Sequence, residues 1–427
     1  MKIRPLSPSL AIAAGLSLAV AAVSLTSCVT SNSGSQPISL KSAFKKYFRV
    51  GVAINRNQVT DTEAVTGTNV TRSLALINKD ISVIQDQFIQ ISPENDLKWE
   101  VIQPYEGPNG YNFAPADAYV NFGVNNHLYI VGHTLVWHNQ TPGWVFLATN
   151  TPPPDGWVGG LETPRGGRGG GGFGRGGRGG AGGAPATREQ VLQRMHDHIF
   201  TVVGRYKGKI RVWDVVNEAL DDSGGTNLLR QTSPWLRSIG PDFIAQAFKW
   251  AHEADPDAIL RYNDYSLENP VKRHKLVTLI KQLQADHVPV MAIGSQTHVS
   301  VSSPSFQRED EALTEIASLG LPIHITELDV NGAAAGQRST SGDVAGNAAA
   351  TQGGLVDDAN KKLADEYTIL FNAFVKHSDS VKVITFWGVN DAVSWRANGR
   401  PLLFDGDDQA KPAYDAVLAT AHPASKK

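Results

Sequence analysis

The hydrophobic positions of the chain fall into eight short, nearly continuous apolar runs, most of them separated by segments long enough to form a helix. The runs cover residues 50–54, 88–92, 128–137, 210–217, 258–265, 290–297, 323–328 and 381–389. Runs of this kind are typical of parallel strands that are buried on both faces. The segments 188–206, 241–254 and 269–287 have the amphipathic spacing of helices, and Asn269-Pro270 is a typical helix start. The pattern predicts an α/β protein built from strand–helix units.

Eight such units in one chain favour a single closed (β/α)8 barrel, the TIM barrel. The alternative is an open, doubly wound sheet, but no glycine-rich dinucleotide-binding loop follows any of the runs. In a barrel, functional residues lie at the carboxyl ends of the strands. Polar and aromatic residues gather at these ends in this sequence: Glu94, Asn95, His133, Trp137, Asn217, Glu218, Asn263, Asp264, Tyr265, Gln296, His298, Glu327, Asp329 and Trp387.

Two low-complexity insertions interrupt the strand–helix pattern. Residues 152–185 contain a run of Arg-Gly-Gly repeats, and residues 331–354 are rich in Ala, Gly, Ser and Thr. The first has too few apolar side chains to offset the entropy of ordering it, so we expect it to be disordered. Both insertions follow predicted strands, so we expect both to be loops on the catalytic face.

The amino-terminal residues 1–27 have the features of an export signal. Lys2 and Arg4 precede an apolar stretch, residues 10–25, which is shorter than the ~20 residues of a membrane-spanning helix. The sequence Leu25-Thr-Ser-Cys28 resembles a bacterial lipobox and predicts lipidation at Cys28; the alternative is ordinary cleavage with an incidental cysteine. Residues 28–40 are expected to form a flexible tether, residues 41–420 the barrel domain and residues 421–427 a tail. We expect a cell-envelope lipoprotein, at the outer membrane, the cell surface or in the periplasm, or otherwise a secreted protein.

Composition restricts the partners. The chain of 427 residues is 41% hydrophobic and has a formal net charge of −2, which gives no electrostatic case for binding nucleic acid or an anionic membrane. Arg-Gly-Gly repeats also occur in nucleic-acid-binding segments, but an exported protein meets little nucleic acid. We therefore expect no nucleic-acid partner, a membrane contact only through the lipid at Cys28, and a monomer.

Glu218 and Glu327 are the candidate catalytic pair, because each ends a buried strand beside other polar groups. One carboxyl group, held protonated, can donate to a leaving oxygen while the other, ionised, attacks a sugar carbon. The alternative is that each forms a structural ion pair. His298 lies two residues past Gln296 and is expected to hold Glu327 ionised by a hydrogen bond, and Asp329 is expected to orient His298.

Metal and serine chemistry are not favoured. The possible metal ligands are His133, His138, His298, His324, Glu327 and Asp329. They do not follow the spacing of zinc or calcium motifs, and Cys28 is the only cysteine. No Gly-x-Ser-x-Gly sequence is present. We expect neither a metal nor a cofactor.

Several stretches of the chain resemble the family 10 glycoside hydrolases, the endo-β-1,4-xylanases. They are Pro93-Glu-Asn-Asp-Leu-Lys-Trp99, Gly132-His-Thr-Leu-Val-Trp-His138, Trp213-Asp-Val-Val-Asn-Glu218, Ile325-Thr-Glu-Leu-Asp-Val330, Phe386-Trp-Gly-Val389 and Ser394-Trp395. The resemblance covers residues 41–418 apart from the two insertions, and the stretches occur in the family's order. It implies a (β/α)8 barrel that hydrolyses β-1,4-xylan with retention of configuration and needs no cofactor.

The resemblance also implies a role for individual residues. Glu218 matches the general acid/base of the family and Glu327 its nucleophile. Asn217 matches the residue that binds the 2-hydroxyl of the attacked sugar, and His298 with Asp329 matches the support of the nucleophile. Positions that match the glycone subsites are Glu94, Asn95, Lys98, His133, Trp137, Gln296, Trp387 and Trp395, and Tyr265 is expected on the leaving-group side.

Departures from the family pattern are small, and two other functions stay open. Leu97 stands where the family often has Met, and Asn390 where Thr is frequent. The first alternative is a β-1,4-glucanase or cellulase activity on the same barrel. The second is a non-catalytic glycan-binding lipoprotein, although the presence of both Glu218 and Glu327 argues against it.

Overall fold

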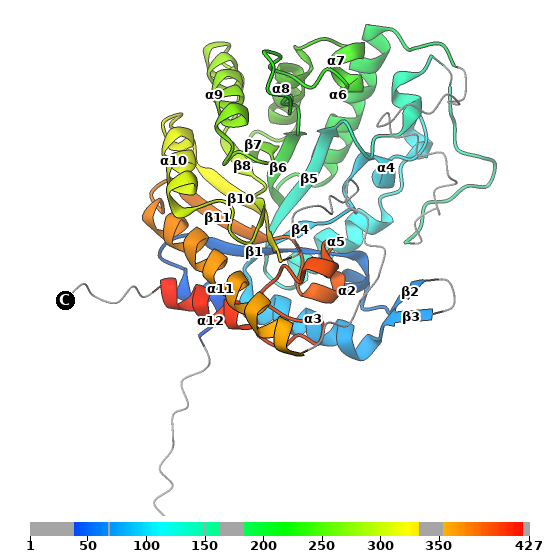
Figure 1. Cartoon of the computed structure of the whole chain (residues 1–427). Coiled ribbons are helices and arrows are strands. Elements are labelled where there is room, and N and C mark those ends of the chain that lie inside the picture. The colour runs from blue at the N-terminus through cyan, green and yellow to red at the C-terminus, as the bar shows by residue number, and fades with distance from the viewer. Residues whose placement is uncertain (1–37, 67–68, 149, 162–182, 333–352, 422–427) are drawn as a thin grey trace, which may run out of the picture. The chain divides into compact units, whose positions relative to one another are not determined.

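Eight parallel strands form a closed barrel in the computed structural model, which describes residues 38–66, 69–148, 150–161, 183–332 and 353–421 (Figure 1). The strands are β1 (Arg49–Ile54), β4 (Gln90–Pro93), β5 (Tyr129–Trp137), β6 (Ile210–Asn217), β7 (Ile259–Asp264), β8 (Ala292–Ser295), β10 (Ile323–Asn331) and β11 (Val381–Phe386). They pair in this order, and β11 pairs with both β10 and β1, which closes the ring. Every predicted apolar run overlaps one of these strands, although β1, β4 and β10 extend beyond their runs. The predicted (β/α)8 barrel is therefore confirmed.

Helices surround the barrel (Figure 1). The longer ones are α3 (Leu74–Gln87), α5 (Ala114–Asn125), α6 (Arg188–Arg205), α8 (Phe243–Ala254), α9 (Pro270–Ala285), α10 (Phe306–Ala317), α11 (Gly353–Lys376) and α12 (Pro412–Thr420). The shorter ones are α1 (Leu40–Ala43), α2 (Arg56–Thr60), α4 (Trp99–Ile102) and α7 (Pro234–Ser238), and four 3-10 turns are η1 (Pro108–Gly110), η2 (Gly143–Phe146), η3 (Asp391–Val393) and η4 (Ala397–Gly399). The predicted start of α9 is confirmed, because the Asn269 side chain caps the helix by accepting from Val271 N.

The core follows from the apolar strands. Buried Val, Ile, Leu and aromatic side chains run through β1, β6, β10 and β11 and continue into the helices that pack on them. One close approach between strands depends on a glycine: Gly132 pairs with Trp213, and a Cβ on Gly132 would lie 2.2 Å from the indole ring. The small residue in β5 therefore creates the space that the large residue of β6 occupies.

Three short strands were not predicted. β2 (Ala64–Thr66) and β3 (Asn69–Arg72) form an antiparallel pair after α2. β9 (His298–Ser300) pairs with the end of β10, so that His298 lies opposite Asp329. Each of them contains a single Val among small or polar residues, so no apolar run marks it in the sequence.

The two ends of the first insertion pack on the barrel domain. Residues 150–161 and 183–185 lie within the described part of the chain, and several of them form hydrogen bonds. Ala148 N donates to Ala184 O at 2.7 Å and Leu147 forms a bridge with Pro185, so the two ends of the insertion meet beside η2. Trp157 also packs against the ring of Tyr105. Residues 152–161 are thus held by contacts with the barrel, and most of the predicted disordered segment, residues 162–182, lies outside the described residues.

The barrel domain also begins slightly earlier than predicted. Leu40 starts α1 and is fully buried, so the end of the predicted tether belongs to the domain. The predicted signal peptide, Cys28 and most of the tether lie outside the described residues. So do the Gly/Arg run at 162–182, residues 333–352 of the second insertion, and residues 422–427 of the tail. Among the described helices, none has the length and apolarity needed to cross a membrane.

Candidate active site

Glu218 and Glu327 are connected by a short relay of side-chain amides. Gln296 Nε2 donates to Glu218 Oε1 at 2.9 Å and to Asn217 Oδ1 at 3.2 Å. Asn263 Nδ2 donates to the same Asn217 Oδ1 at 2.9 Å and to Glu327 Oε1 at 2.8 Å. The two carboxyl groups, predicted from separate strand ends, therefore lie in one hydrogen-bonded cluster.

Glu218 follows β6 directly and has a left-handed backbone conformation, with φ of 58°. Two neighbouring backbone amides are fixed by β7: Glu218 N donates to Asn263 O at 2.9 Å, and Ala219 N donates to Tyr262 Oη at 3.1 Å. The Tyr262 hydroxyl in turn donates to Asp264 at 2.7 Å. These bonds hold a conformation that is uncommon for a residue with a side chain.

The Glu218 carboxylate contacts neutral donors. Trp137 Nε1 donates to Oε2 at 2.9 Å, and Oε1 accepts from Gln296. Asn217 Nδ2 lies 3.4 Å from Oε1. Because Asn217 Oδ1 already accepts from two amides, its Nδ2 is oriented towards Glu218.

Glu327 lies in a different electrostatic environment. His298 Nε2 is 3.3 Å from Glu327 Oε2, and Asn263 bonds the other oxygen. Burial alone would raise the pKa of Glu327, but the hydrogen bond from His298 and the charges of His133 and His298 outweigh it and hold the pKa below the usual value. The expectation that His298 keeps Glu327 ionised agrees with this geometry.

His298 is itself held by Asp329. Its Nδ1 lies 3.0 Å from Asp329 Oδ2, an ion-pair distance, although the ring N–H is not aligned as a hydrogen bond. Burial lowers the pKa of His298, but the charges of Asp329 and Glu327 raise it to about 9. Asp329 also accepts from Trp395 Nε1 at 2.7 Å and from Arg396 at 2.9 Å. The imidazole is therefore a cation between two carboxylates.

The predicted glycone residues after β4 form a buried polar group. Lys98 Nζ donates to Asn95 Oδ1 at 2.9 Å and to Gln140 Oε1 at 2.8 Å. It also lies 5.1 Å from the centre of the Trp137 ring. Burial raises the pKa of Glu94 to about 7, with Lys98 opposing the shift. Lys98 is almost fully buried, so it is not a surface ion pair.

The predicted aromatic residues frame His133 and His298. The ring of Trp387 is 5.3 Å from that of His133 and 6.4 Å from that of His298, and Trp395 is 4.9 Å from His298. The structure therefore brings both tryptophans to the Glu327 side of the cluster.

Tyr265 lies in a charged group next to Glu218 rather than against either carboxylate. Its hydroxyl donates to Asp222 at 2.5 Å and accepts from Arg230 at 2.8 Å. Lys272 Nζ lies 3.2 Å from the centre of its ring, and burial raises the pKa of the phenol to about 12. Arg230 Nε also donates to Glu218 O, which ties the group to the loop after β6.

Sequence reasoning missed an ionic network under the site. Arg261 donates to both oxygens of Asp214 at 2.6 and 2.9 Å, and His133 Nδ1 is 3.0 Å from the same carboxylate. Burial opposes the ionisation of Asp214, but the charge of Arg261 lowers its pKa to about 2. His324 accepts from Arg261 at 3.0 Å, and burial keeps its pKa well below the usual value. Asp214 and Arg261 lie inside apolar runs and not at strand ends, so their positions did not indicate a role in the site.

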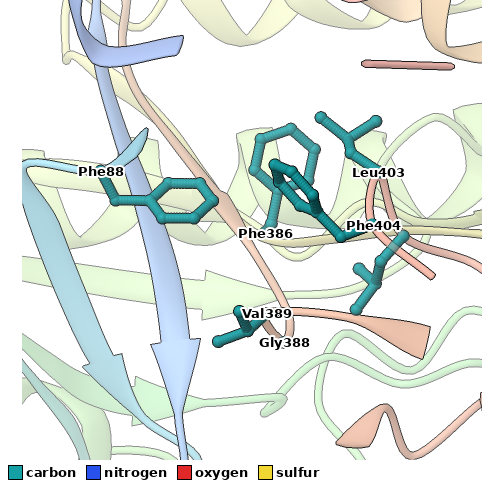
Figure 2. A pocket seen from close by; sticks show the side chains of 7 residues that line it. Phe88, Phe386, Gly388, Val389, Leu403 and Phe404 are labelled. Carbon is teal, nitrogen blue, oxygen red and sulfur yellow. The ribbon is translucent and has the colours of Figure 1, made fainter. Parts of the chain in front are cut away.

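The described residues also show which alternatives to the carboxylate cluster exist as a functional site. No group of three or more metal-ligating side chains is present in the described residues. Figure 2 shows a pocket lined only by apolar residues and a glycine: Phe88, Phe386, Gly388, Val389, Leu402, Leu403 and Phe404. It offers no polar side chain to bind a sugar hydroxyl.

Known proteins resemble this chain over nearly all of the barrel. An endo-1,4-beta-xylanase A of a Caldicellulosiruptor species is 37% identical over 381 residues, which are 89% of this chain and 47% of that protein. A beta-1,4-xylanase of Dictyoglomus thermophilum is 33% identical over 387 residues, covering 89% of this chain and 90% of the relative. The chain thus spans about half of the first relative and most of the second.

A solved structure and a family model agree with these relatives. The structure of an endoxylanase retrieved from a sugarcane soil metagenome superposes with a TM-score of 0.70 at 32% identity, and covers 90% of this chain and 99% of that one. The sequence model of glycosyl hydrolase family 10 matches residues 39–420. The chain therefore belongs to glycosyl hydrolase family 10.

Proposed function

We propose that this protein is a retaining endo-β-1,4-xylanase. The observation that carries the proposal is the relay in which Asn217, Asn263 and Gln296 connect Glu218 to Glu327. Two glutamates in one cluster, with different electrostatic surroundings, match the requirements of double displacement at a glycosidic bond. The named xylanases among its relatives support xylan as the substrate.

Glu327 is the nucleophile in this mechanism. Its carboxylate is kept ionised by His298 and oriented by Asn263. A carboxylate oxygen attacks the anomeric carbon, the bond from that carbon to the leaving oxygen breaks, and an ester to Glu327 forms. His298 stays charged between Glu327 and Asp329, so it stabilises the carboxylate both before attack and when it is released.

Glu218 is the general acid and then the general base. It protonates the departing oxygen in the first step and takes a proton from water in the second, when water attacks the ester and releases Glu327. Trp137 and Gln296 hold its two oxygens with neutral donors, which fit both protonation states. Asn217 Nδ2 is the donor for the 2-hydroxyl of the attacked sugar.

The remaining predicted residues bind the glycone sugars. Asn95 and Lys98 present hydrogen-bonding groups after β4, and Trp387 and Trp395 present aromatic surface on which a pyranose ring can pack. Glu94, with its pKa raised to about 7, is partly protonated at neutral pH and can both donate to and accept from a hydroxyl. Trp137 contacts both Lys98 and Glu218, Gln296 bonds Glu218, and His133 packs against Trp387.

One experiment tests both the substrate and the stereochemistry. The protein is incubated with xylan, cellulose and mixed-linkage glucan, and the first-formed products are followed by proton NMR. We expect short xylo-oligosaccharides whose new reducing end is initially β. Preferential cleavage of cellulose would establish the glucanase alternative, and an initial α anomer would rule out retention. Glu218→Gln and Glu327→Gln should both be inactive on xylan.

We further propose that the chain is exported and anchored through a lipid on Cys28. The basic residues Lys2 and Arg4, the apolar stretch 10–25 and the sequence Leu25-Thr-Ser-Cys28 support this. Fatty-acid labelling in a bacterial host should mark the wild type and fail to mark Cys28→Ser. An unlabelled wild type that accumulates in the medium would instead indicate ordinary secretion.

A further inference from the structure

Two aromatic rings outside the barrel core meet on the loops that follow β4 and β5. The ring centres of Tyr105 and Trp157 are 5.2 Å apart, and the ring planes make an angle of 75°. Both side chains are half-buried, and neither packs against the hydrophobic core. In an edge-to-face pair, one ring keeps both of its faces outside the contact. The pair therefore has aromatic surface that the fold does not use.

Trp157 belongs to a surface segment, residues 150–161, that is anchored at its start. Glu106 N donates to Thr151 O at 2.9 Å, and Thr151 N donates back to the Glu106 carboxylate at 3.0 Å. Arg194 donates to the other oxygen of Glu106 at 2.9 Å, which ties the pair to α6. The segment is thus fixed to the loop that carries Tyr105.

The end of the segment is anchored as well. Asn112 Nδ2 donates to Gly160 O at 2.9 Å. A Cβ on Gly159 would lie 2.5 Å from Asn112 Oδ1, so a side chain there would push the segment away. Two anchors, one on each side of Trp157, define where the ring lies.

Arg56 connects this segment to the loop that supplies glycone-binding residues. Arg56 Nη1 donates to Leu161 O at 2.7 Å, and Arg56 Nε donates to Asp96 at 3.1 Å. Asp96 directly follows Asn95. Both loops leave the carboxyl ends of their strands, which is the catalytic face of a (β/α)8 barrel. The segment therefore borders the face where Asn95 and Lys98 lie.

Apolar side chains on the segment face solvent. Val158 is 84% exposed and Leu161 is 46% exposed. Together with the half-buried Trp157, they give this anchored loop an apolar surface of the kind on which the apolar face of a sugar can pack.

We propose that Tyr105 and Trp157 form an additional sugar-binding subsite, which packs a xylose unit of a xylan chain extending past Asn95 and Lys98. The inference rests on the proposed function, because the same polysaccharide must continue from the catalytic cleft. A pyranose ring has an apolar C–H face that packs on an aromatic ring. The subsite has no part in bond cleavage and serves only substrates long enough to reach it.

Trp157→Ala tests the subsite with two substrates of different length. Xylohexaose is long enough to extend beyond the cleft, whereas an aryl xylobioside is not. We expect the ratio of kcat/KM for xylohexaose to kcat/KM for the aryl xylobioside to fall about fivefold. Trp157→Leu keeps an apolar contact with Tyr105 but has no flat face, so it should show the same fall. Trp157→Phe should retain most of the ratio.

Trp250 on α8 is the matched control. It is also half-buried and meets a ring, that of His196, edge to face at 5.2 Å, but it packs against the core. Trp250→Ala should leave the ratio unchanged. In a Glu327→Gln background, which does not turn over, Trp157→Ala should weaken the binding of xylohexaose by the same factor in calorimetry.

Two results would overturn the proposal. The ratio could equal that of the wild type, or both substrates could lose activity equally, which would mean that the ring only holds the segment against the Asn95 loop. Failure of the proposed function is a separate result, since the wild type would then hydrolyse neither substrate.

Discussion

At the scale of single residues, the site is a line of alternating charge. Arg396 and Trp395 donate to Asp329, Asp329 faces His298, and His298 faces Glu327. The raised pKa of His298 and the lowered pKa values of Asp329 and Glu327 are consequences of this order. These charges keep the carboxyl group of Glu327 ionised over the working pH range.

Removing the charge of His298 should move the acidic limb of the pH–rate profile. His298 lowers the pKa of Glu327, so in His298→Asn that pKa rises and the acidic limb of kcat/KM shifts to higher pH, by about one to two pH units. The profile is measured with an aryl xylobioside. His377→Asn is the control, because His377 pairs with Asp310 outside the site. An unshifted limb in His298→Asn would contradict the assignment.

The hydroxyl of Tyr262 should matter for proton transfer by Glu218. It accepts from Ala219 N and donates to Asp264, and so fixes the left-handed backbone that carries Glu218. We expect Tyr262→Phe to lower kcat roughly tenfold to a hundredfold with little change in KM. The loss should be larger for aryl xylosides with poor leaving groups, which need the acid most.

Tyr119 provides the comparison for Tyr262. It is fully buried and its hydroxyl donates to the carbonyls of Ile91 and Val131. Tyr119→Phe should lower stability without any dependence on the leaving group. If Tyr262→Phe behaves in the same way, its hydroxyl has a structural role only.

The two glutamates and their supports were predictable, but the residues that join them were only partly so. Glu218 and Glu327 end apolar strands, where a carboxyl group is conspicuous. Asn263 also ends a run, yet nothing in the spacing indicated that its amide bridges Asn217 and Glu327. The ion pair of Asp214 and Arg261 could not be predicted from a single sequence. The two charges lie in different strands, and only the pairing of these strands places them opposite each other.

At the scale of elements, the barrel depends on complementary side chains in neighbouring strands. Gly132 in β5 and Trp213 in β6 are directly paired. The apolar runs predicted these strands because long buried strands leave a continuous hydrophobic signal. The short β2, β3 and β9 leave none, and the anchored segment 150–161 is held by side-chain and loop contacts that have no period.

Gly132→Ala should destabilise the barrel. The added Cβ would clash with the ring of Trp213, which is fully buried and cannot move away. The clash can be removed only by a shift between β5 and β6, which costs about 1–3 kcal/mol. Gly204→Ala in α6 is the matched control: its Cβ would meet nothing within 4 Å. Alanine in a helix should stabilise there by roughly 0.5–1 kcal/mol. Both are measured by chemical denaturation; equal effects would contradict the packing account.

At the scale of the whole molecule, buried acids set the pH dependence of stability. Burial raises the pKa of Glu94 to about 7 and of Glu309 to about 8, and burial together with Asp80 raises that of Asp408 to about 7. A group whose pKa is higher in the folded than in the unfolded protein contributes stability. This contribution is complete below the pKa of the unfolded state and is lost as the pH rises through the pKa of the folded state. His298 adds a further loss through about pH 9.

The melting temperature should therefore decrease as the pH rises from about 4.5 to about 9. On the acidic side, Asp214, Glu327 and Asp329 have lowered pKa values and their contribution is lost as the pH falls. Glu309→Gln should flatten the decrease between pH 4.5 and about 8. Glu311→Gln, on the exposed side of the same helix, should leave it unchanged. A melting temperature that rises across this range would contradict the prediction.

The central claim, that Glu327 attacks the sugar, is tested most directly by trapping the covalent intermediate. A 2-deoxy-2-fluoro xylobioside with a good leaving group slows both steps but slows hydrolysis of the ester more, so the glycosyl-enzyme accumulates. After proteolysis, mass spectrometry should find the added disaccharide on Glu327 in the wild type and no adduct in Glu327→Gln. An adduct on Glu218, or turnover with no adduct at all, would contradict the mechanism.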